Sequence, residues 1–411
     1  MTERRSPEIT PHTAIGVSLA LLGVVLTLDN LGFVDAHAVF RYWPLIPMLV
    51  GAAFVVQGRE VRDWVIGAGW MAAGTAFLLR NLDVFHFRLS DFLPLVLVAV
   101  IALAAWPAVG SSSTWLTLTF AGLAMGMIVF IAASGLTLVF GLMDVLNFGH
   151  SLFIALGAYI ATSVFAATLG WTSVASLAPT LAAVGLAMLA AMLLGGVFGL
   201  GFERVIVRPV YGQHLKQILV TIGGAIVGEE LIKVVWGPAQ IPLPLPEALR
   251  GSVLIGDAAV EKFRLVAVAV GLVVLAVLLW MLNRTKIGLL IRAGVQDREM
   301  VESLGYRIRR LFVGVFAAGS ALAGLGGSLW GMNQQIVVPQ IGGQVNVLLF
   351  IVIIIGGLGS TLGCLVGALV VGLLTNYVGF LAPKLTMFSS IGLMVAVLIW
   401  RPQGLYPVTS R

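Results

Sequence analysis

A succession of long apolar runs with almost no charge limits the possible folds of this chain. Of the 411 residues, 59% are hydrophobic and only 10% are charged. A helix needs roughly 20 apolar residues to cross a hydrocarbon core about 30 Å thick, whereas a membrane barrel shows alternating segments of about 10 residues. We therefore predict an all-α, polytopic transmembrane helical bundle. After residue 115 the apolar runs are 116–143, 148–169, 174–200, 218–236, 265–282, 311–330, 345–380 and 387–400.

The last long run, 345–380, exceeds the length of a single span. A glycine-rich stretch at 356–360 interrupts it. We expect either two passages or one bent helix here, because glycine weakens a continuous helix.

Positive charge is concentrated in short loops beside the spans. The loop 284–310 holds seven of the 24 Lys and Arg residues, and Arg204, Arg208 and Lys216 mark a second basic loop. By the positive-inside rule both loops are cytoplasmic, and the Pro-rich loop 237–264 is then external. We therefore attribute the net charge of +6 to basic residues in loops beside the membrane lipid, where they set the topology of the spans. We predict no nucleic-acid partner.

The basic loop 284–310 also has a helical pattern. Its apolar residues recur at roughly helical spacing, which is typical of a short amphipathic helix that offers an apolar stripe to a partner. The alternative is a solvated loop whose charges only set topology. The residues of the stripe are Ile291, Val295, Met300, Val301 and Leu304.

The first 110 residues carry an internal duplication. The stretch beginning AIGVSLALLG at Ala14 returns about 51 positions later from Val65, so two helix pairs are expected. This region resembles the four-helix membrane domain of LiaF-type cell-envelope stress proteins, and a structural or regulatory bundle is the implied role. Small polar residues at 108–114 mark a boundary, which predicts domains at 1–110 and 111–411.

Polar residues interrupt the membrane-spanning pattern at two places. Asp144, Asn147 and His150 lie in the middle of apolar sequence, where polar groups belong either to a substrate path or to an interfacial loop between short helices. In the run 218–236, Glu229 and Lys233 are four residues apart. We favour a structural ion pair on one helix face there over the alternative, a role in transport.

Other site chemistry is not indicated. The His residues are scattered, Cys364 is the only cysteine, and no GxxxxGK[ST] phosphate loop is present, so we predict a non-enzymatic chain that binds no metal or cofactor and hydrolyses no ATP itself. Glycines at small-xxx-small spacing predict close helix packing. They are Gly327 and Gly331, and Gly359, Gly363 and Gly367.

From 116 to 407 the sequence resembles the membrane permease subunit of branched-chain amino-acid ABC importers. The matching motifs are GLTLVFGLMDVLNFGH from Gly135, ERVIVRP from Glu203, GLLIRAGVQDREMVESLG from Gly288, GGLGSTLGCLVGALVVG from Gly356 and WRPQGLYP from Trp400. The resemblance implies a location in the inner membrane of a prokaryote. The apolar runs predict about eight spans in this region.

The same resemblance implies partners and site residues. The partners would be two cytoplasmic ABC ATPase subunits, a second permease subunit and an extracytoplasmic solute-binding protein. The loop helix would dock into an ATPase subunit, and Asn147 and His150 would lie on the substrate path. The residues implied in docking are Arg292, Ala293, Asp297, Leu304 and Gly305.

The sequence leaves two alternatives open. The solute could be urea or a short amide, since related importers share these motifs, or the chain could be a membrane sensor or scaffold that has lost transport. The family usually begins near the position of Leu116, so the N-terminal four-helix domain is expected to be an addition.

Overall fold

The computed structural model describes residues 43–57, 67, 70, 71, 74, 93–143, 145, 147–296 and 298–406. Contacts divide the chain into two compact units, Met1–Phe92 and Leu93–Arg411. In the first unit, helix α3 spans Leu45–Gln57. A Cβ at Gly51 would lie 2.6 Å from the Gly67 carbonyl oxygen, so small residues allow two segments of this unit to approach closely.

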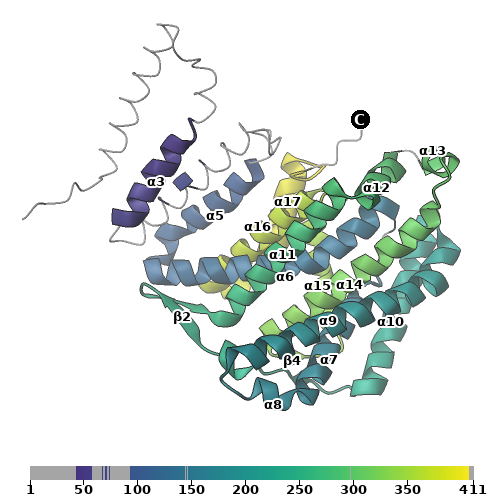
Figure 1. The fold of residues 1–411 in the computed structure, drawn as a ribbon, viewed down its shortest axis with the longest axis horizontal. Coiled ribbons are helices and arrows are strands. Elements are labelled where there is room, and N and C mark those ends of the chain that lie inside the picture. The colour runs from purple at the N-terminus through teal and green to yellow at the C-terminus, as the bar shows by residue number, and fades with distance from the viewer. Residues whose placement is uncertain are drawn as a thin grey trace, which may run out of the picture. The chain divides into compact units, whose positions relative to one another are not determined.

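The second unit is a helical bundle (Figure 1). Its helices are α5 (Leu93–Val109), α6 (Ser112–Met143), α7 (His150–Ala167), α8 (Leu169–Thr172), α9 (Leu177–Phe202), α10 (His214–Trp236), α11 (Lys262–Arg284), α12 (Lys286–Gln296), α13 (Arg298–Ser303), α14 (Ile308–Gln334), α15 (Ile341–Gly356), α16 (Thr361–Leu381) and α17 (Thr386–Trp400). A π-helical turn, η2 (Glu203–Val207), continues α9, and 3-10 turns follow at η3 (Arg208–Val210), η4 (Glu247–Leu249) and η5 (Pro383–Leu385).

Helix α14 lies at the centre of this bundle and packs against α6, α7 and α9. Aromatic rings join three of these helices, because Phe153 of α7 lies 5.5 Å from Phe202 of α9 and 6.2 Å from Phe316 of α14, between ring centroids. By contrast, α9, α10, α11 and α17 carry many exposed large apolar side chains. Such a surface suits contact with lipid. Apolar side chains need no hydrogen-bond partners there, and the helices satisfy their own backbone polar groups.

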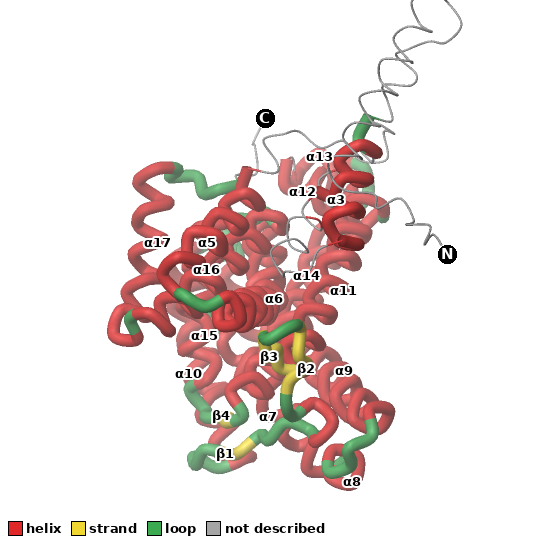
Figure 2. The backbone as a smooth tube through the Cα atoms, turned by 90° about the vertical axis from the view of Figure 1, so that its left-hand side faces the viewer, coloured by secondary structure: helices red, strands yellow, loops and turns green. Residues whose placement is uncertain are grey.

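Four short strands lie among the connections. The pair β1 (Ile241–Pro242) and β4 (Ile336–Val337) is antiparallel, with Ile241 opposite Val337. A hairpin pairs β2 (Ser252–Ile255) with β3 (Ala258–Glu261), with Ser252 opposite Glu261. Figures 1 and 2 place β1, β4 and α8 at the end of the bundle away from α12 and α13. The Pro-rich loop 237–264 is therefore far from the basic loop 284–310.

The apolar runs correspond closely to the helices. Seven helices in the described part of the chain are long and apolar enough to cross a membrane, which confirms the prediction of a polytopic helical bundle. The run 345–380 forms two helices, α15 and α16, because a tight turn that contains Gly357 and Gly359, both with positive φ, separates them. Helix α10 is not among the seven, since every 18-residue window within it holds at least three charged residues.

Helix α5 belongs with the second unit. It packs against α16 and α6, the Trp115 indole N–H donates to the Ala102 carbonyl at 2.6 Å, and the Trp106 and Trp115 rings are 4.8 Å apart. The boundary between the two compact units therefore lies between residues 92 and 93, whereas the sequence pattern changes near residue 110. The duplicated four-helix domain at 1–110 stays a prediction, because most of its residues lie outside those described.

Candidate functional site

The polar interruption between α6 and α7 is enclosed by protein. Helix α6 ends at Met143 and α7 begins at His150, and the side chains of Val145, Asn147 and His150 are fully buried. Asp144 lies outside the described residues. Non-helical backbone at membrane depth requires protein around it, and this segment meets that requirement.

Hydrogen bonds from three helices hold the interruption. The His150 Nε2 is 3.0 Å from the Ala132 carbonyl oxygen of α6. The Phe148 backbone N–H donates to Thr221 Oγ1 of α10 at 3.3 Å, and the Asn346 amide of α15 donates to the Phe148 carbonyl at 3.5 Å. The broken segment therefore fixes the relative positions of α6, α10 and α15.

Several buried polar atoms here have no hydrogen-bond partner among the described residues. They are both amide atoms of Asn147, the His150 Nδ1 and the Asn346 Oδ1. A buried polar atom without a hydrogen-bond partner lowers the stability of the fold by about 1–3 kcal/mol. Four such atoms in one region are therefore not explained by a purely structural role. Asn147 and His150 were predicted from sequence; Asn346 and Thr221 were not, although Asn346 is the one polar residue within the apolar stretch VNVLLF.

A groove of about 230 Å³ opens beside this segment, between α7, α10 and the start of α15. Phe148, Leu152, Ile222 and Ile226 give it apolar walls, and Glu229 is the only charged residue among the described residues that line it. Sequence reasoning missed this groove because it is formed by residues almost 200 positions apart.

The predicted ion pair at Glu229 is present and has a third member. The Lys233 Nζ lies 3.2 Å from Glu229 Oε1 and 2.7 Å from Glu230 Oε1. Two carboxylates thus share one ammonium group, which leaves one negative charge uncompensated in this cluster.

The loop 284–310 contains two short helices, α12 and α13, rather than one. Ile291 and Val301 are only 7% and 3% exposed and belong to the protein's own core, whereas Leu304 is 64% exposed. The prediction of one apolar stripe facing a partner is therefore wrong for Ile291 and Val301, because the bundle itself covers them. Met300 is also exposed.

The residues implied in docking lie along this segment. Arg292 and Ala293 are in α12, and Ala293 is partly buried against the core; Asp297 lies outside the described residues. Leu304 and Gly305 follow α13. Gly305 has φ +86° and its N–H donates to the Glu302 carbonyl at 3.0 Å, so a residue without a Cβ suits the turn into α14.

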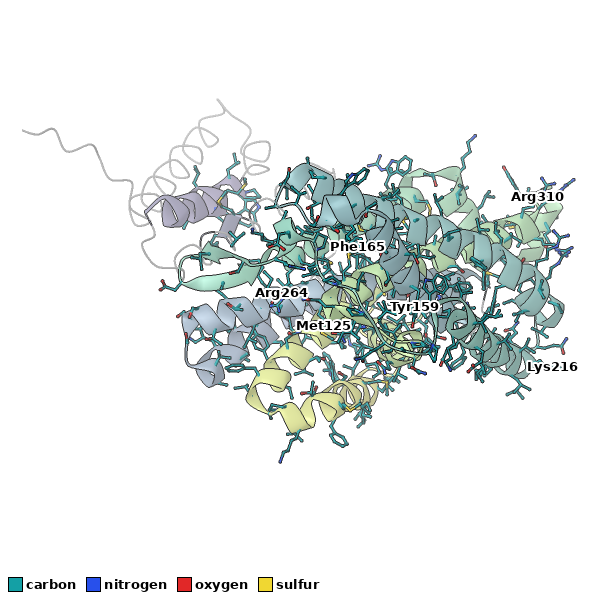
Figure 3. The ribbon with its side chains drawn as sticks, turned by 90° about the horizontal axis from the view of Figure 1, so that it is seen from below. Met125, Tyr159, Phe165, Lys216, Arg264 and Arg310 are labelled. Carbon is teal, nitrogen blue, oxygen red and sulfur yellow. The ribbon has the colours of Figure 1, made fainter. Side chains whose placement is uncertain are left out.

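The two basic loops lie at the same end of the bundle. Tyr211, after η3, lies 6.3 Å from Phe312 of α14 between ring centroids, and its hydroxyl donates to Glu203 Oε1 at 2.6 Å. Lys216 and Arg310 lie near the same edge in Figure 3, away from Arg264. This placement agrees with the sequence prediction that both loops face one side of the membrane.

The spaced glycines divide into two kinds. A Cβ at Gly327 would overlap the Ile154 carbonyl of α7, and one at Gly331 would lie 3.1 Å from Ala158. Gly363 and Gly367 bring α16 against Gly356 and Val352 of α15. Gly359 differs, because it has φ +78° and lies in the turn before α16, so it is not part of a helical packing row.

No group of three or more His, Cys, Asp or Glu residues that could hold a metal ion occurs among the described residues. Cys364 is buried in α16. The functional features of the described chain are therefore the enclosed polar segment, the groove and the two basic loops.

Comparison with known proteins identifies the family. Residues 118–398 match the family model described as branched-chain amino acid transport system / permease component. The permease protein LivH of Escherichia coli is 25% identical over 299 residues, which cover 70% of this chain and 93% of LivH. BraD of Pseudomonas aeruginosa is 26% identical over 293 residues, with coverages of 69% and 93%. No solved structure matches.

The N-terminal region also has counterparts. Residues 13–55 match the LiaI-LiaF-like transmembrane region, which confirms that resemblance for this stretch. LivM of Escherichia coli is 28% identical over 423 residues, covering 96% of this chain and 91% of LivM. The family model itself begins at residue 118, close to the position expected for the start of the family, whereas the alignment with LivM extends through most of the N-terminal region. That the N-terminal region is an addition to the family stays a prediction. The chain belongs to the branched-chain amino-acid transport system permease family and is a multi-pass integral protein of the inner membrane.

Proposed function

We propose that this chain is the membrane-spanning permease subunit of an ATP-driven importer for branched-chain amino acids or related small solutes. Two cytoplasmic ABC ATPase subunits would supply energy, an extracytoplasmic binding protein would deliver the solute, and a second permease subunit would complete the conduit. Family membership supports this proposal, as does the similarity to both LivH and LivM, two permease proteins of Escherichia coli. The absence of a phosphate-loop motif from the sequence fits a division of labour with separate ATPases.

The observation that carries the coupling role is the position of α12 and α13. Ile291 and Val301 attach this segment to the bundle core, while Leu304 remains 64% exposed beside a cluster of basic residues. An exposed leucine that directly follows a helix held to the core by Val301 is suited to insertion into a groove of another protein. We infer that Leu304 enters the ATPase subunit, and that Arg292 and Asp297 lie at the edge of the contact.

The connection to α14 explains how movement would spread. The chain turns at Gly305 and enters α14 at Ile308, and α14 packs against α6, α7 and α9. Because close-packed helices move as rigid bodies, displacement of α13 would shift the helices that surround Asn147 and His150. These two residues would then line the substrate path when the subunit opens.

The proposal is tested by a matched pair of leucine variants. Leu304→Glu changes the proposed contact, and Leu254→Glu makes the same change at a leucine that is 72% exposed on the β2–β3 hairpin at the other end. Both variants, and the unaltered chain, would be solubilised from native membranes and their associated ATPase subunits quantified.

We expect Leu304→Glu to lose most of the associated ATPase and Leu254→Glu to retain it. Covering a side chain that is already one-third covered would contribute roughly 1–2 kcal/mol, or about 5- to 30-fold in affinity, and a buried carboxylate adds to that loss. Replacement of residues 292–305 by a Gly/Ser linker should abolish recovery. Equal recovery in all variants, or recovery only of kinase or scaffold proteins, contradicts the proposal.

A functional assay complements the binding assay. The double variant Asp297→Lys with Gly305→Trp should insert normally but lose solute uptake, since both changes lie in a loop outside the spans. Unimpaired uptake by this variant would refute the docking role.

A further inference from the structure

Three buried phenylalanine rings form one cluster beside the enclosed polar segment. Phe202 is the last residue of α9, Phe153 lies in the first turn of α7, and Phe316 lies in α14. The Phe202 ring stacks on the Phe316 ring, with centroids 6.3 Å apart and an angle of 11° between the planes, and it meets Phe153 edge to face at 5.5 Å. The cluster therefore joins α7, α9 and α14 at one place.

Two glycines leave room for the Phe202 ring. A Cβ at Gly149 would overlap this ring, and one at Gly224 of α10 would lie 2.8 Å from it. The Asn147 Oδ1 is 3.0 Å from the same Cβ position at Gly149. The Phe202 ring and the Asn147 amide are therefore neighbours, and the ring covers one side of the polar segment.

The covered side faces the basic loops. Helix α9 ends at Phe202, and the basic loop that contains Arg204 follows directly. Phe316 is one turn after Phe312 in α14, and the Phe312 ring lies 6.3 Å from the ring of Tyr211 in that loop, between centroids. A row of aromatic rings thus runs from the loop to the polar segment.

One buried hydrogen bond fixes the end of α9. Glu203 is buried, and a buried carboxyl group is costly unless it is hydrogen-bonded. The Tyr211 hydroxyl supplies that bond to the Glu203 Oε1 at 2.6 Å. Because Glu203 directly follows Phe202 and begins the π-helical turn η2, the position of the Phe202 ring depends on the conformation of the loop.

The polar atoms beside the ring make the closed arrangement costly. Both amide atoms of Asn147 and the His150 Nδ1 have no hydrogen-bond partner among the described residues. Moving the Phe202 ring aside would lose apolar contacts, but it would also let water or a solute reach these atoms and satisfy them. These two terms oppose each other, so the closed and open arrangements differ less in free energy than the ring contacts alone would give. A small difference of this kind is what a gate requires.

We propose that Phe202 is a gate residue whose ring closes the polar segment at Asn147 and His150 toward the basic loops, an inference that rests on the proposed transport function. The three rings form an apolar barrier that excludes water, as hydrophobic constrictions do in channels. Glu203 and Tyr211 form the latch, because their hydrogen bond fixes the loop that directly follows the ring. Movement of this loop would withdraw the Phe202 ring and open the segment.

The gate is tested by the reactivity of a thiol placed behind it. Asn147→Cys breaks no side-chain hydrogen bond to a described residue, and the natural Cys364 is fully buried. The full-length variant in membrane vesicles would be treated with a cationic methanethiosulfonate reagent that does not cross membranes. Inside-out vesicles present the basic loops to the reagent, and right-side-out vesicles present the other end. Each variant without Asn147→Cys gives the background from Cys364.

We expect the introduced thiol to react slowly in the otherwise unaltered chain. Adding Phe202→Ala should raise its modification rate roughly 10-fold or more in inside-out vesicles, because two ring pairs that stabilise the closed arrangement are lost. The rate in right-side-out vesicles should change much less.

Phe263→Ala is the matched control, because it removes an equally buried ring at the start of α11, outside the cluster, and it should leave the rate low. Tyr211→Phe keeps every ring of the cluster but breaks the latch, so it should raise the rate to a smaller extent. This variant also tests the gate if Phe202→Ala does not fold.

Four results would overturn the proposal. They are rapid reaction before any ring is removed, an unchanged rate in both Phe202→Ala and Tyr211→Phe, an equal increase in Phe263→Ala, and an equal increase in both kinds of vesicle. The reaction requires no ATPase, whereas the proposed function is tested by ATPase recovery with Leu304→Glu. Failure of the gate and failure of the proposed function are therefore distinguishable.

Discussion

Replacing Gly327 by leucine should separate α7 from α14. A Cβ at Gly327 would overlap the Ile154 carbonyl oxygen and lie 2.8 Å from the Ile154 Cα, both backbone atoms that cannot rotate away. The only relief is a shift of one whole helix. Gly314 of the same helix is the matched control, because it is exposed and nothing lies within 4 Å of its added Cβ.

The size of the effect follows from two opposing terms. Leucine favours the helix over glycine by about 0.7 kcal/mol at either position, whereas overpacking a close contact costs about 1–3 kcal/mol and more for a large side chain. Gly314→Leu should therefore be neutral or stabilising. Gly327→Leu should lower the free energy of unfolding, so that the two variants differ by roughly 2–4 kcal/mol, or 30- to several-hundred-fold in the folded-to-unfolded ratio.

The measurement is the unfolding of each purified variant in mixed detergent micelles, followed by helical circular dichroism. Gly327→Leu is expected to unfold at lower temperature and lower denaturing-detergent concentration than the unaltered chain. If both variants unfold together with the unaltered chain, the close approach of α7 and α14 at Gly327 is incorrect.

Three further predictions concern buried groups. The Cys364 thiol should resist a water-soluble maleimide until the chain is unfolded, since it has no exposed surface; rapid reaction of the folded chain would contradict this burial. Tyr211→Phe should destabilise the fold by about 1–3 kcal/mol, because the buried Glu203 loses a hydrogen bond of 2.6 Å. Tyr306→Phe, at an exposed tyrosine, should leave the stability unchanged, and equal thermal stability of the two variants would be inconsistent with that bond. Trp115→Phe should cost about 0.5–1.5 kcal/mol in thermal unfolding, since its indole N–H donates to a carbonyl of α5; an unchanged midpoint would show that α5 is not held there.

The helices were predictable because the bilayer imposes a simple length and polarity rule on each of them. Every apolar run from 116 onwards overlaps an observed helix, and Gly357 and Gly359 divide 345–380 where the glycine-rich stretch suggested. The ion pair of Glu229 and Lys233 was predictable for a similar reason, since spacing along one helix determines which side chains meet.

Other features depended on contacts between distant segments. No periodicity indicates that the bundle covers Ile291 and Val301 while Leu304 stays exposed, because that division depends on what packs against each face. Gly359 has the spacing of a packing glycine but lies in a turn with positive φ. The place of α5 beside α16 likewise follows from its neighbours and not from its composition.

The membrane class, the order of the helices and the family motifs were evident from the amino acids alone, because hydrophobic length and local spacing act within single segments. That Phe148, Glu229 and Gly343 share one groove became clear only in the folded structure. The same holds for the burial of both amide atoms of Asn147 and of the Asn346 Oδ1, which have no hydrogen-bond partner among the described residues. Sites of this kind arise where three helices converge, and the packing that brings them together is a property of the whole bundle rather than of any one segment.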